Sequence, residues 1–574
     1  MRMAPDPKPL VVQSDLLLLL ETDSPGYSEA RDAIAPFAEM VKCPEYVHTY
    51  KITPLSLWNA AAAGLDAPQV IGRLRAFSRY PVMDSLAVRI SDLMSRYGRI
   101  RLLPHDAAHH RLIVEDPAWL ARFRGDPAVA GYIGPDAAPC EALVRVIDRG
   151  LLKQALIKAG YPVQDLAGYA AGAPLAVPMR ENERFRLRAY QTAARDAFFK
   201  GGTALGGSGV VVLPCGAGKT IVGLAAMSLL GTQTLILATG ITAIRQWKRE
   251  LLDKTGLAES DIGEYSGAVK DIRPVTLTNY QLLTYRKRGP RGQRGEDQDA
   301  PSAGPGEAGD FLHFHVLNDQ PWGLIIYDEV HLLPARIFRF AASLQAVRRL
   351  GLTATLVRED GREDDVFSLI GPKCYDVPWK VIERQGWIAR AVCREVKVPA
   401  DAATWAAYAA AGPRGMYRAA AENPAKLAVL ERIIARHPGE KILIIGQYLD
   451  QVGHIAASLN IPLITGATPQ DERERLFREF RDGSLDRLVA SSVANFAVDL
   501  PDASVAIQVS GKFGSRQEEA QRLGRILRPK ADGRPASFYT LVTADTEEEE
   551  FALRRQMFLT EEGYAYEILR PAEL

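Results

Sequence analysis

Cysteine is scarce in this chain, which has 5 cysteines among 574 residues. The cysteines are scattered, and no two of them are separated by just two residues. This spacing argues against a disulfide framework, a zinc ribbon and a cysteine-ligated iron–sulfur cluster. Because such cysteine usage is typical of a reducing compartment, we expect a cytoplasmic protein.

Long apolar runs are missing as well. The most apolar run near the start of the chain, Leu16–Leu20, is far too short for the core of a signal peptide or for a membrane span. We therefore expect no membrane partner.

An excess of either charge is also missing, because 70 Lys and Arg residues face 69 Asp and Glu residues and leave a net charge of +1. This balance argues against polyanion binding through bulk charge, although a neutral sum leaves room for a local basic groove. With 47% hydrophobic and 24% charged residues, the composition is that of a globular protein with several cores.

The first part of the chain divides into two units, and no internal repeat stands out. Residues 1–95 alternate short apolar runs with turn signals, and residues 96–180 predict a small mixed α/β unit. The expected helices of the first unit are Glu29–Val41 and Ala67–Ser78. In the second unit the expected strands are Arg99–Leu103 and Arg111–Val114, and the expected helices are Ala118–Phe123 and Gly150–Ala159.

Two later regions, 181–375 and 426–574, contain near-continuous apolar runs that alternate with helical patterns. Strands of a parallel sheet covered by crossover helices on both faces have this pattern. We therefore predict the α/β fold class, with two tandem parallel-sheet domains preceded by smaller α/β or α+β domains. The predicted strands are Gly209–Leu213, Thr234–Ala238, Val275–Thr278, Gly323–Tyr327 and Arg349–Thr353 in the first sheet, and Lys441–Ile445, Ile461–Ile464, Asp486–Ala490, Ser504–Val509 and Ser537–Val542 in the second.

One segment differs from its surroundings. Residues 286–310 repeat Gly, Pro and Arg with almost no apolar side chain, which predicts a disordered insertion at a loop tip. Its arginines are candidates for nucleic-acid contact, although a solvated loop is the simpler explanation.

A phosphate-binding loop is the strongest local signal. The predicted strand Gly209–Leu213 leads into Pro214–Thr220 and then into a helical pattern. Glycines let backbone N–H groups converge on phosphate oxygens, and a helix N-terminus adds a positive dipole end. Lys219 is placed to reach the β- and γ-phosphates, and the Thr220 hydroxyl to hold Mg²⁺. Leu213 replaces the first glycine of the general pattern, and the shortened Gly-Ala-Gly-Lys-Thr form is the variant of helicase-type ATPases.

Two carboxylates, Asp328 and Glu329, follow the buried run that begins at Leu324. In the same sheet as a phosphate loop, Asp328 is placed to bind Mg²⁺, and Glu329 to orient and deprotonate the attacking water. A solvated turn is the alternative for an isolated Asp-Glu pair. His331 is a candidate for coupling the ATP site to the next segment, or else a buried core histidine.

Two further segments carry polar side chains that suit the same chemistry. Thr353 and Thr355 end a strand, where hydroxyl groups either relay hydrogen bonds toward a domain interface or simply close the strand. Arg525 and Arg528 lie three residues apart on a helical pattern that includes Gln521, so they share one face. There they would stabilise charge on the γ-phosphate as arginine fingers, and a solvated basic helix is the alternative.

In this order the segments resemble those of a superfamily 2 helicase with an Asp-Glu-Val-His box, and more narrowly those of the XPB helicase family in its bacterial form. The resemblance extends from about Phe185 to the C-terminus, and more loosely over the first 180 residues. It rests on Leu187–Gln191, Gly351–Asp360, Asp499–Pro501, Gln517–Arg528 and the tail Phe538–Leu569.

The resemblance implies two RecA-like motor domains, ATP and Mg²⁺ as cofactors, and a set of site residues. The residues implied for catalysis are Lys219, Asp328, Glu329, Gln521, Arg525 and Arg528. Those implied for ATP binding are Arg188, Gln191 (which would read adenine), Leu213, Pro214, Cys215, Gly216, Ala217, Gly218, Lys219, Thr220 and Asp499, with Thr220 and Asp328 as the Mg²⁺ ligands. Those implied for DNA binding or coupling are Thr239, Trp247, Thr278, Tyr280, His331, Thr353, Thr355, Arg358, Glu359, Asp360, Gln447 and Gly466.

The resemblance also implies a division of the chain into domains. The implied domains are an N-terminal extension (1–95), a damage-recognition-like domain (96–180), a first motor domain (181–375), a thumb-like helical insertion (376–425) and a second motor domain (426–574).

The activity implied is that of an ATP-dependent DNA helicase or translocase that moves 3′ to 5′ in DNA repair or in transcription-linked DNA opening. The expected partners are single-stranded DNA and duplex junctions, together with a nuclease or another repair protein. Two alternatives stay open at this point, namely an RNA helicase and an ATP-gated DNA-binding scaffold that recruits a nuclease.

Overall fold

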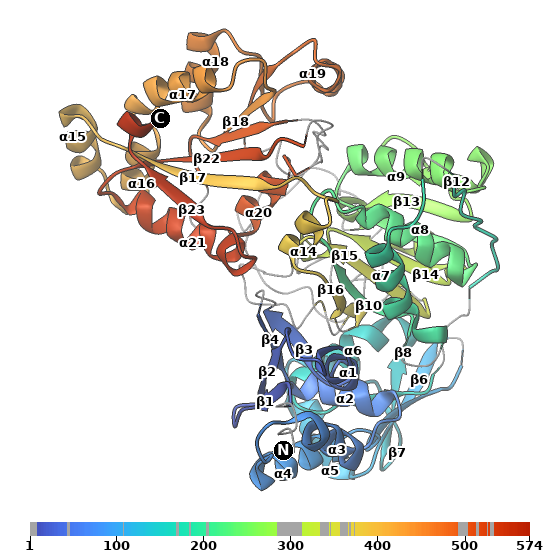
Figure 1. The fold of residues 1–574 in the computed structure, drawn as a ribbon. Coiled ribbons are helices and arrows are strands. Elements are labelled where there is room, and N and C mark those ends of the chain that lie inside the picture. The colour runs from blue at the N-terminus through green and yellow to red at the C-terminus, as the bar shows by residue number, and fades with distance from the viewer. Residues whose placement is uncertain are drawn as a thin grey trace.

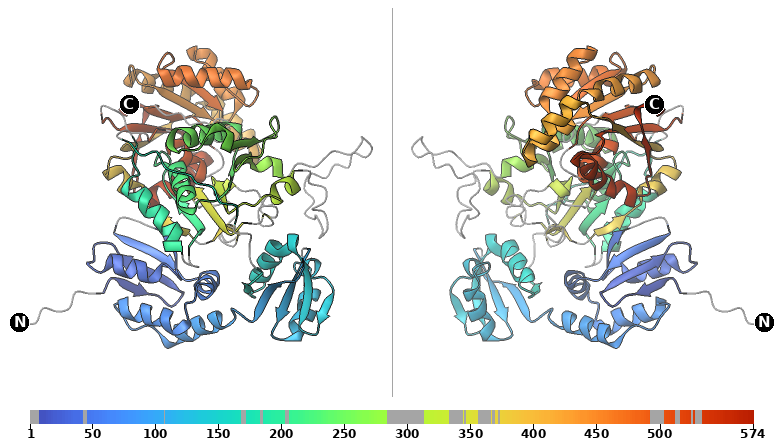
Figure 2. Two further views of the ribbon diagram at one scale, coloured as in Figure 1. Left: turned by 90° about the vertical axis from the view of Figure 1, so that its right-hand side faces the viewer. Right: turned by 90° about the vertical axis from the view of Figure 1, so that its left-hand side faces the viewer.

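The computed structural model contains four sheet-based units along the chain (Figure 1). Two small N-terminal units lie against the first of two larger lobes, and Figure 2 shows them side by side below it. No helix in the described part of the chain is long and apolar enough to cross a membrane. The structure describes residues 8–42, 46–106, 108–167, 172–182, 185–202, 206–283, 313–332, 344, 346–355, 366, 369–371, 373–491, 503–511, 516–524, 526–527 and 533–574.

The first unit is a four-stranded antiparallel sheet, in the order β1-β2-β4-β3, packed against four helices. Alternate residues of its strands face inward, as Leu18 and Leu20 do in β2. Its elements are β1 (Leu10–Val12), β2 (Leu17–Glu21), α1 (Tyr27–Ile34), β3 (Glu39–Lys42), β4 (Val47–Lys51), α2 (Pro54–Ala62), α3 (Ala67–Phe77) and α4 (Asp84–Ser95).

The helix predicted at Glu29–Val41 is wrong in its second half, whereas the one predicted at Ala67–Ser78 is confirmed as α3. The first helix ends at Ile34, and the chain then forms β3, which pairs with β4. Glu39 of β3 is buried, and its carboxylate accepts a hydrogen bond from the Thr53 hydroxyl at 2.9 Å. Strand pairing is a long-range contact, so the local periodicity of the sequence does not report it.

The second unit is a five-stranded sheet in the order β7-β8-β6-β5-β9 with two helices. Both predicted strands and both predicted helices are confirmed, as β5, β6, α5 and α6. Its elements are β5 (Ile100–Pro104), β6 (His109–Val114), α5 (Pro117–Gly125), β7 (Asp136–Ala138), β8 (Glu141–Arg145), α6 (Arg149–Lys158) and β9 (Val163–Asp165).

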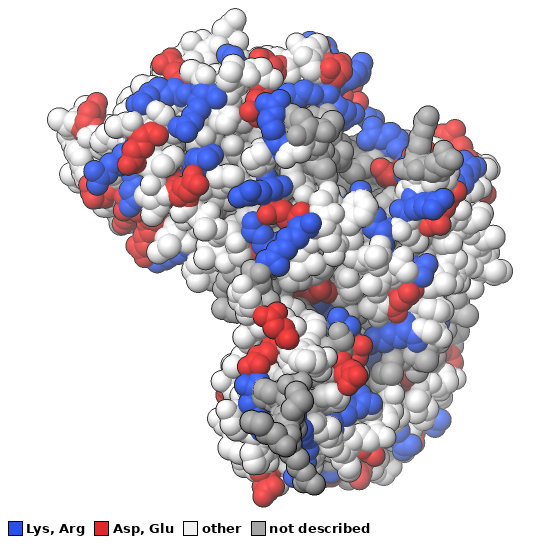
Figure 3. Space-filling view, in the orientation of Figure 1, with Lys and Arg blue, Asp and Glu red and all other residues white. Residues whose placement is uncertain are grey.

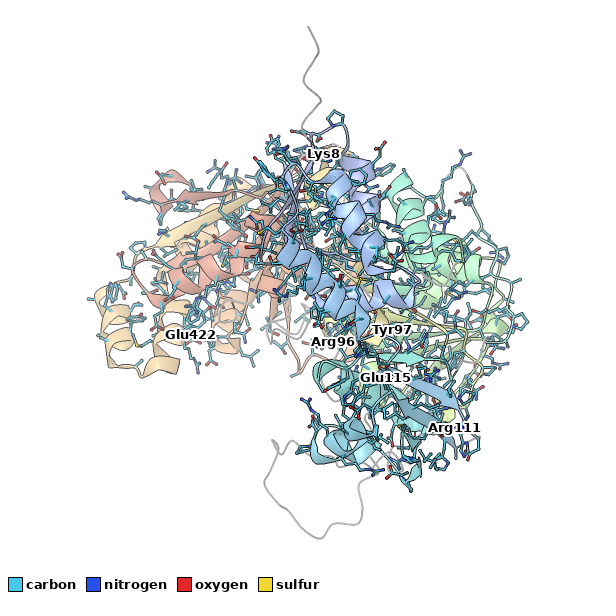
Figure 4. The ribbon with its side chains drawn as sticks, turned by 90° about the horizontal axis from the view of Figure 1, so that it is seen from below. Lys8, Arg96, Tyr97, Arg111, Glu115 and Glu422 are labelled. Atoms are coloured by element: carbon cyan, nitrogen blue, oxygen red, sulfur yellow. The ribbon has the colours of Figure 1, made fainter. Side chains whose placement is uncertain are left out.

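The two N-terminal units are docked on the first lobe. Leu55 of α2 and Leu151 of α6 pack against the core of that lobe. Around this contact lies a cavity of about 410 Å³ that all three units line. Tyr97, which lines the cavity, lies with Arg96 where α4 leads into the second unit, as Figure 4 shows from below.

The first lobe is a seven-stranded parallel sheet in the order β12-β13-β11-β14-β15-β10-β16. All five predicted strands are confirmed, and β11 and β13 are buried along their whole length. The short edge strands β12 and β16 were not predicted, and the expected insertion at 286–310 lies outside the described residues. The elements are α7 (Ala189–Phe199), β10 (Ser208–Val212), α8 (Lys219–Leu230), β11 (Thr234–Ala238), α9 (Ile241–Lys254), β12 (Ile262–Tyr265), β13 (Val275–Asn279), α10 (Tyr280–Leu283), α11 (Phe314–Asn318), β14 (Leu324–Asp328), β15 (Arg348–Thr353) and β16 (Lys373–Asp376).

The second lobe is also a seven-stranded parallel sheet, in the order β19-β20-β18-β21-β22-β17-β23. The expected pair of tandem parallel-sheet domains is thus confirmed. The elements are α14 (Trp379–Arg384), which precedes the lobe, then β17 (Ala391–Val398), α15 (Ala402–Ala410), α16 (Pro413–Ala421), α17 (Ala425–Arg436), β18 (Ile442–Gly446), α18 (Leu449–Leu459), β19 (Leu463–Ile464), α19 (Gln470–Asp482), β20 (Arg487–Ser491), β21 (Val505–Gln508), α20 (Arg516–Gly524), β22 (Ala536–Thr543), α21 (Glu547–Glu561) and β23 (Tyr566–Leu569).

The segment 376–425 is not the purely helical insertion that we expected. Its strand β17 belongs to the second sheet and pairs with β22 over its full length, from Ala391 opposite Ala536 onward. Charged residues such as Arg394 and Lys397 interrupt the apolar run of β17, so this strand lacks the signal that marks its neighbours. Only α15 and α16 form a helical insertion, between β17 and α17.

A buried ion pair ties α17 to α21 in the second lobe. Lys426 Nζ and Glu548 Oε1 lie 2.8 Å apart, and their side chains are 1% and 0% exposed. We expect Glu548→Gln to lower the free energy of unfolding by about 3 kcal/mol, because it leaves the Lys426 charge buried without its counter-charge. Chemical denaturation followed by circular dichroism measures this loss.

Two further variants serve as controls for this prediction. The double variant Lys426→Met/Glu548→Gln removes both charges and should recover most of the loss. Glu479→Gln, which breaks the exposed pair with Arg475 on α19, should leave the unfolding curve unchanged. A double variant that is no more stable than Glu548→Gln would contradict the electrostatic explanation.

Candidate active site

The expected strand, loop and helix are present where β10 ends and α8 begins at Lys219. Gly216 and Gly218 have φ angles of 79° and 80°, in the left-handed region that glycine adopts without strain. A Cβ at Gly218 would also lie 2.6 Å from Gln191 Nε2. The loop therefore turns tightly enough to present the N–H groups and the positive dipole end of α8 to an anion.

The segment at the start of α7 braces this loop. Tyr190 OH and Gln191 Nε2 both donate hydrogen bonds to the carbonyl oxygen of Ala217, at 2.6 and 3.0 Å. Gln191 Oε1 accepts a hydrogen bond from the backbone N–H of Arg188 at 3.0 Å. Both polar atoms of the Gln191 side chain are thus engaged within the protein, and its reading of adenine stays a prediction. Tyr190 was not predicted as a site residue, although it lies within the segment that carries the family resemblance.

Lys219 faces the two carboxylates at the end of β14. Its Nζ lies 3.1 Å from Glu329 Oε1. Burial alone would lower the pKa of Lys219, but the negative charge of Glu329 holds this pKa above its ordinary value. Burial, followed by the charge of Glu329, raises the pKa of Asp328 to about 6. Two acids and one ammonium group thus share a partly exposed site, where a further cation would relieve the repulsion between the acids.

Two buried aromatic side chains hold Asp328 in place. Trp247 Nε1 donates a hydrogen bond to Asp328 Oδ2 at 2.8 Å, and Tyr280 OH donates one to the Asp328 carbonyl oxygen at 2.7 Å. The next residue, Glu329, has a φ of 49°, which is uncommon for a residue with a side chain. These hydrogen bonds fix the chain at the turn that directs Glu329 toward Lys219.

Three residues that were predicted to serve DNA binding or coupling are buried near this turn. Trp247, Tyr280 and Thr278 are 1%, 4% and 0% exposed, so they offer no surface to a DNA strand in this structure. They were predicted to serve DNA binding or coupling, and the contacts of Trp247 and Tyr280 with Asp328 favour coupling.

A chain of hydrogen bonds runs from Thr355 and Thr353 of the first lobe through His331, which is buried, to Gln521 of the second lobe. His331 Nδ1 lies 2.5 Å from Thr353 Oγ1 and 3.5 Å from Glu329 Oε2. The Thr353 hydroxyl donates to the carbonyl oxygen of Thr355 at 2.6 Å, so Nδ1 is the donor toward Thr353. His331 Nε2 then accepts the hydrogen bond from Gln521 Nε2 of α20, at 3.1 Å. The structure therefore joins four of the predicted residues across the two lobes.

The two lobes also touch at the phosphate loop itself. A Cβ at Gly524, the last residue of α20, would lie 2.3 Å from the Cβ of Cys215. Only a glycine lets α20 come this close to the loop. Farther out, Arg245 of α9 forms an exposed ion pair with Glu474 of α19. Gly524 was not predicted as a site residue. Its contact with Cys215 shows that a glycine is needed here for the close approach of α20 to the loop.

Protein-family models match three parts of the chain. The model for the ERCC3/RAD25/XPB C-terminal helicase matches residues 382–573, and that for the type III restriction enzyme res subunit matches residues 184–358. These two matches fall on the second and the first lobe. A model for a helicase conserved C-terminal domain matches residues 10–138, within the N-terminal units.

Curated relatives match nearly the whole chain. Proteins named DNA 3′-5′ helicase XPB from Kineococcus radiotolerans and Mycobacterium tuberculosis are each 52% identical to it, over 98% of this chain and 96% and 98% of their own lengths. The chain belongs to the XPB helicase family. A more distant member, the XPB subunit of the general transcription and DNA repair factor IIH from Antonospora locustae, is 33% identical over 98% of this chain and 82% of its own length.

The other residues that the XPB resemblance pointed to fall into two groups. Thr239, Gln447 and Gly466 follow the carboxyl ends of β11, β18 and β19, and all three are at least partly exposed. Since they sit at the strand ends where ligands of α/β sheets bind, their predicted contact with DNA stays open. The predicted site residues that lie outside the described residues are Arg358, Glu359, Asp360, Asp499, Arg525 and Arg528.

Asp328→Asn is expected to stabilise the fold. The raised pKa of the carboxyl group means that the folded state binds its proton more tightly than the unfolded state does. The destabilising charge is therefore absent below the ordinary pKa of about 4 and fully present above a pH of about 6. We expect the amide to raise the free energy of unfolding by about 1–3 kcal/mol at a pH near 8, and by less at a pH near 5. Thermal unfolding at both pH values measures this gain, and a gain that grows on acidification would contradict the pKa assignment.

Proposed function

We propose that the chain is an ATP-dependent DNA helicase or translocase that moves 3′ to 5′ along DNA. The observation that supports this most directly is the seam between the lobes. There Lys219 and Glu329 of the first lobe are connected through His331 to Gln521 of the second. A nucleotide bound at this seam would contact both lobes, so its binding and hydrolysis could change the arrangement of the lobes, as a motor protein requires. The bacterial relatives bear the name of such a helicase.

The residues of the first lobe divide the work of ATP hydrolysis between them. The loop Gly216–Lys219 would bind the phosphates through backbone N–H groups, and Lys219 would exchange Glu329 for a phosphate oxygen. This exchange frees the Glu329 carboxylate to orient a water molecule and to accept its proton. The ion pair between Lys219 and Glu329 thus engages both groups until a phosphate takes the place of the carboxylate.

Mg²⁺ fits the same site. The Thr220 hydroxyl and the Asp328 carboxylate are hard oxygen ligands of the kind that Mg²⁺ prefers. Burial and the neighbouring charge of Glu329 raise the pKa of Asp328, and a cation bound beside these carboxylates would offset both effects. Bound there, the ion would neutralise charge on the phosphates, while Trp247 holds the carboxylate in position.

DNA binding by this chain would depend on contacts at particular residues rather than on the net charge of the protein. Acidic and basic side chains are interspersed over the face shown in Figure 3, in keeping with the net charge of +1. Phosphate contacts at Thr239, Gln447 and Gly466 would grip one strand without reading its sequence, so binding should weaken with salt. The helices α15 and α16 and the unit 96–180 are candidates for the thumb-like and damage-recognition-like parts.

The biological setting would be DNA repair or transcription-linked opening of DNA. The relative from Antonospora locustae is named as a subunit of a transcription and repair factor. We therefore expect protein partners for this chain too, with a nuclease or another repair protein as the first candidates.

Strand displacement tests the proposed activity. The chain should separate duplexes with a 3′ single-stranded tail in the presence of ATP and Mg²⁺, and should leave 5′-tailed duplexes intact. ATP turnover should rise with single-stranded DNA and much less with RNA of the same sequence. Binding of DNA without any displacement would favour the scaffold, and equal stimulation by RNA would favour an RNA helicase.

Lys219→Ala should lower DNA-stimulated ATP turnover by at least about 100-fold, because the charge aimed at the transferred phosphate is lost. The circular dichroism spectrum should not change. Lys248→Ala, which removes an ammonium group on α9 that pairs with Glu259, is the control and should retain its turnover. Turnover that survives in Lys219→Ala would refute the site.

Gly524→Ala should separate the lobes. Alanine favours a helix more than glycine does, so any loss must come from the clash of the new methyl group with Cys215. We expect a fall of about tenfold or more in DNA-stimulated turnover, with ATP binding reduced much less. Cys215→Gly should restore part of the turnover of Gly524→Ala, because it removes the atom that the methyl group meets. A double variant no better than Gly524→Ala would contradict the contact.

A further inference from the structure

Trp387 is an aromatic side chain whose position is set by the end of α14. Gly386 follows this helix with a φ of 75°. Its N–H donates to the Glu383 carbonyl oxygen at 2.9 Å, and the N–H of Trp387 donates to the Ile382 carbonyl oxygen at 3.1 Å. This pair of hydrogen bonds is the helix-terminating arrangement that needs a left-handed glycine and places an apolar residue directly after it. The hydrogen bonds that end α14 therefore fix the backbone at Trp387.

The segment that carries Trp387 is anchored to the second lobe. The N–H of Trp379, at the start of α14, donates to Glu562 Oε2 at 3.0 Å. Lys380 Nζ lies 4.0 Å from the ring centroid of Tyr564, which also belongs to the second lobe. On the other side of Trp387, the N–H of Ala389 donates at 2.7 Å to a carbonyl oxygen just beyond α20. The chain enters α14 from β16 of the first lobe, but these three contacts tie Trp387 to the second lobe.

The ring of Trp387 nevertheless reaches the first lobe. The guanidinium carbon of Arg188 lies over the ring, 4.4 Å from its centroid. Arg188 Nη1 donates a hydrogen bond to Tyr190 OH at 3.0 Å, and Tyr190 OH donates to the Ala217 carbonyl oxygen of the phosphate loop at 2.6 Å. Trp387 is 38% exposed, so it is not simply a core residue. A second-lobe side chain thus sets the plane of a guanidinium group that is itself connected to the phosphate loop.

We propose that Trp387 is a positioning residue for the purine base of the bound nucleotide. A guanidinium group has two flat faces, and one aromatic ring on each is a favourable arrangement. Trp387 takes one face of Arg188, and the purine ring stacks on the other. Because Trp387 belongs to the second lobe and Arg188 to the first, binding of the base favours the arrangement in which the lobes are in contact. This inference rests on the proposed use of ATP and adds the means by which the second lobe recognises its base.

Removing the ring tests this role. Trp387→Ala should weaken ATP binding about 5- to 10-fold and raise the KM for ATP by a similar factor. The value of kcat should stay within about twofold of that of the unchanged protein, because the phosphate end is untouched. Trp387→Phe keeps an aromatic face and should restore most of the affinity. Trp405→Ala on α15 is the matched control, since Trp405 is also 38% exposed but lies away from Arg188, and it should change neither value.

Inorganic tripolyphosphate separates a base platform from a general structural role, because it carries the phosphates without a base. Its affinity, measured by calorimetry beside that of ATP, should change less than about twofold in Trp387→Ala. An equal loss for ATP and tripolyphosphate, or an ATP affinity that does not change, would overturn the proposal. Trp387→Leu repeats the test with a side chain that fills more of the space. A protein that binds ATP but shows no DNA-stimulated turnover would refute the helicase function, while the comparison of affinities would still decide the role of Trp387.

Discussion

The structure depends on one constraint at the end of β14, where two carboxylates and one ammonium group are held close together and are only partly exposed. Lys219 pairs with Glu329, and Asp328 remains beside them with a raised pKa. Like charges buried this close destabilise a fold unless something holds them. Here the hydrogen bonds from Trp247 and Tyr280 do so, which explains why large aromatic residues of α9 and α10 are buried at the carboxyl edge of the sheet. This arrangement costs stability, and it is the one through which we propose that a metal ion and a triphosphate bind.

The second lobe contacts both ends of the proposed nucleotide site. At the phosphate end, α20 supplies Gln521 to His331 and brings Gly524 against Cys215. At the other end, Trp387 stacks on Arg188. These two contacts are connected, because the chain two residues after Trp387 is hydrogen-bonded just beyond the end of α20. The parts of the second lobe at the two ends of the proposed site are therefore linked to each other, and we expect them to respond together when a nucleotide binds.

The sequence predicts the parts of this molecule that local chemistry dictates. Buried parallel strands, the glycine loop and the Asp-Glu pair each follow from residue type and spacing, and all of them are present. The failures share a cause, which is that a long-range partner decides the outcome. β3 forms because β4 is there to pair with it, and β17 is a strand despite its charges because β22 and β23 flank it. Trp247 is a further example of a residue whose long-range partner the sequence does not reveal. It was predicted to serve DNA binding or coupling, and its indole N–H donates a hydrogen bond to Asp328. Gly524 lies in a segment that carries the family resemblance, but its contact with Cys215, like that of Trp387 with Arg188, depends on the other lobe and was not predicted.

The docking of the N-terminal units joins them to the first lobe. Leu55 and Leu151 pack into the core of the first lobe, so three of the four sheet-based units form one block. The second lobe touches this block through a hydrophobic cluster that both lobes share and through the buried contact of Gln521 with His331. Farther out it does so through the stacked pair Arg188 and Trp387 and the exposed ion pair between Arg245 and Glu474. A surface ion pair contributes little to stability, so it can break and re-form in each cycle. We therefore expect any opening between the lobes to leave the N-terminal units on the first lobe, against which Leu55 and Leu151 pack.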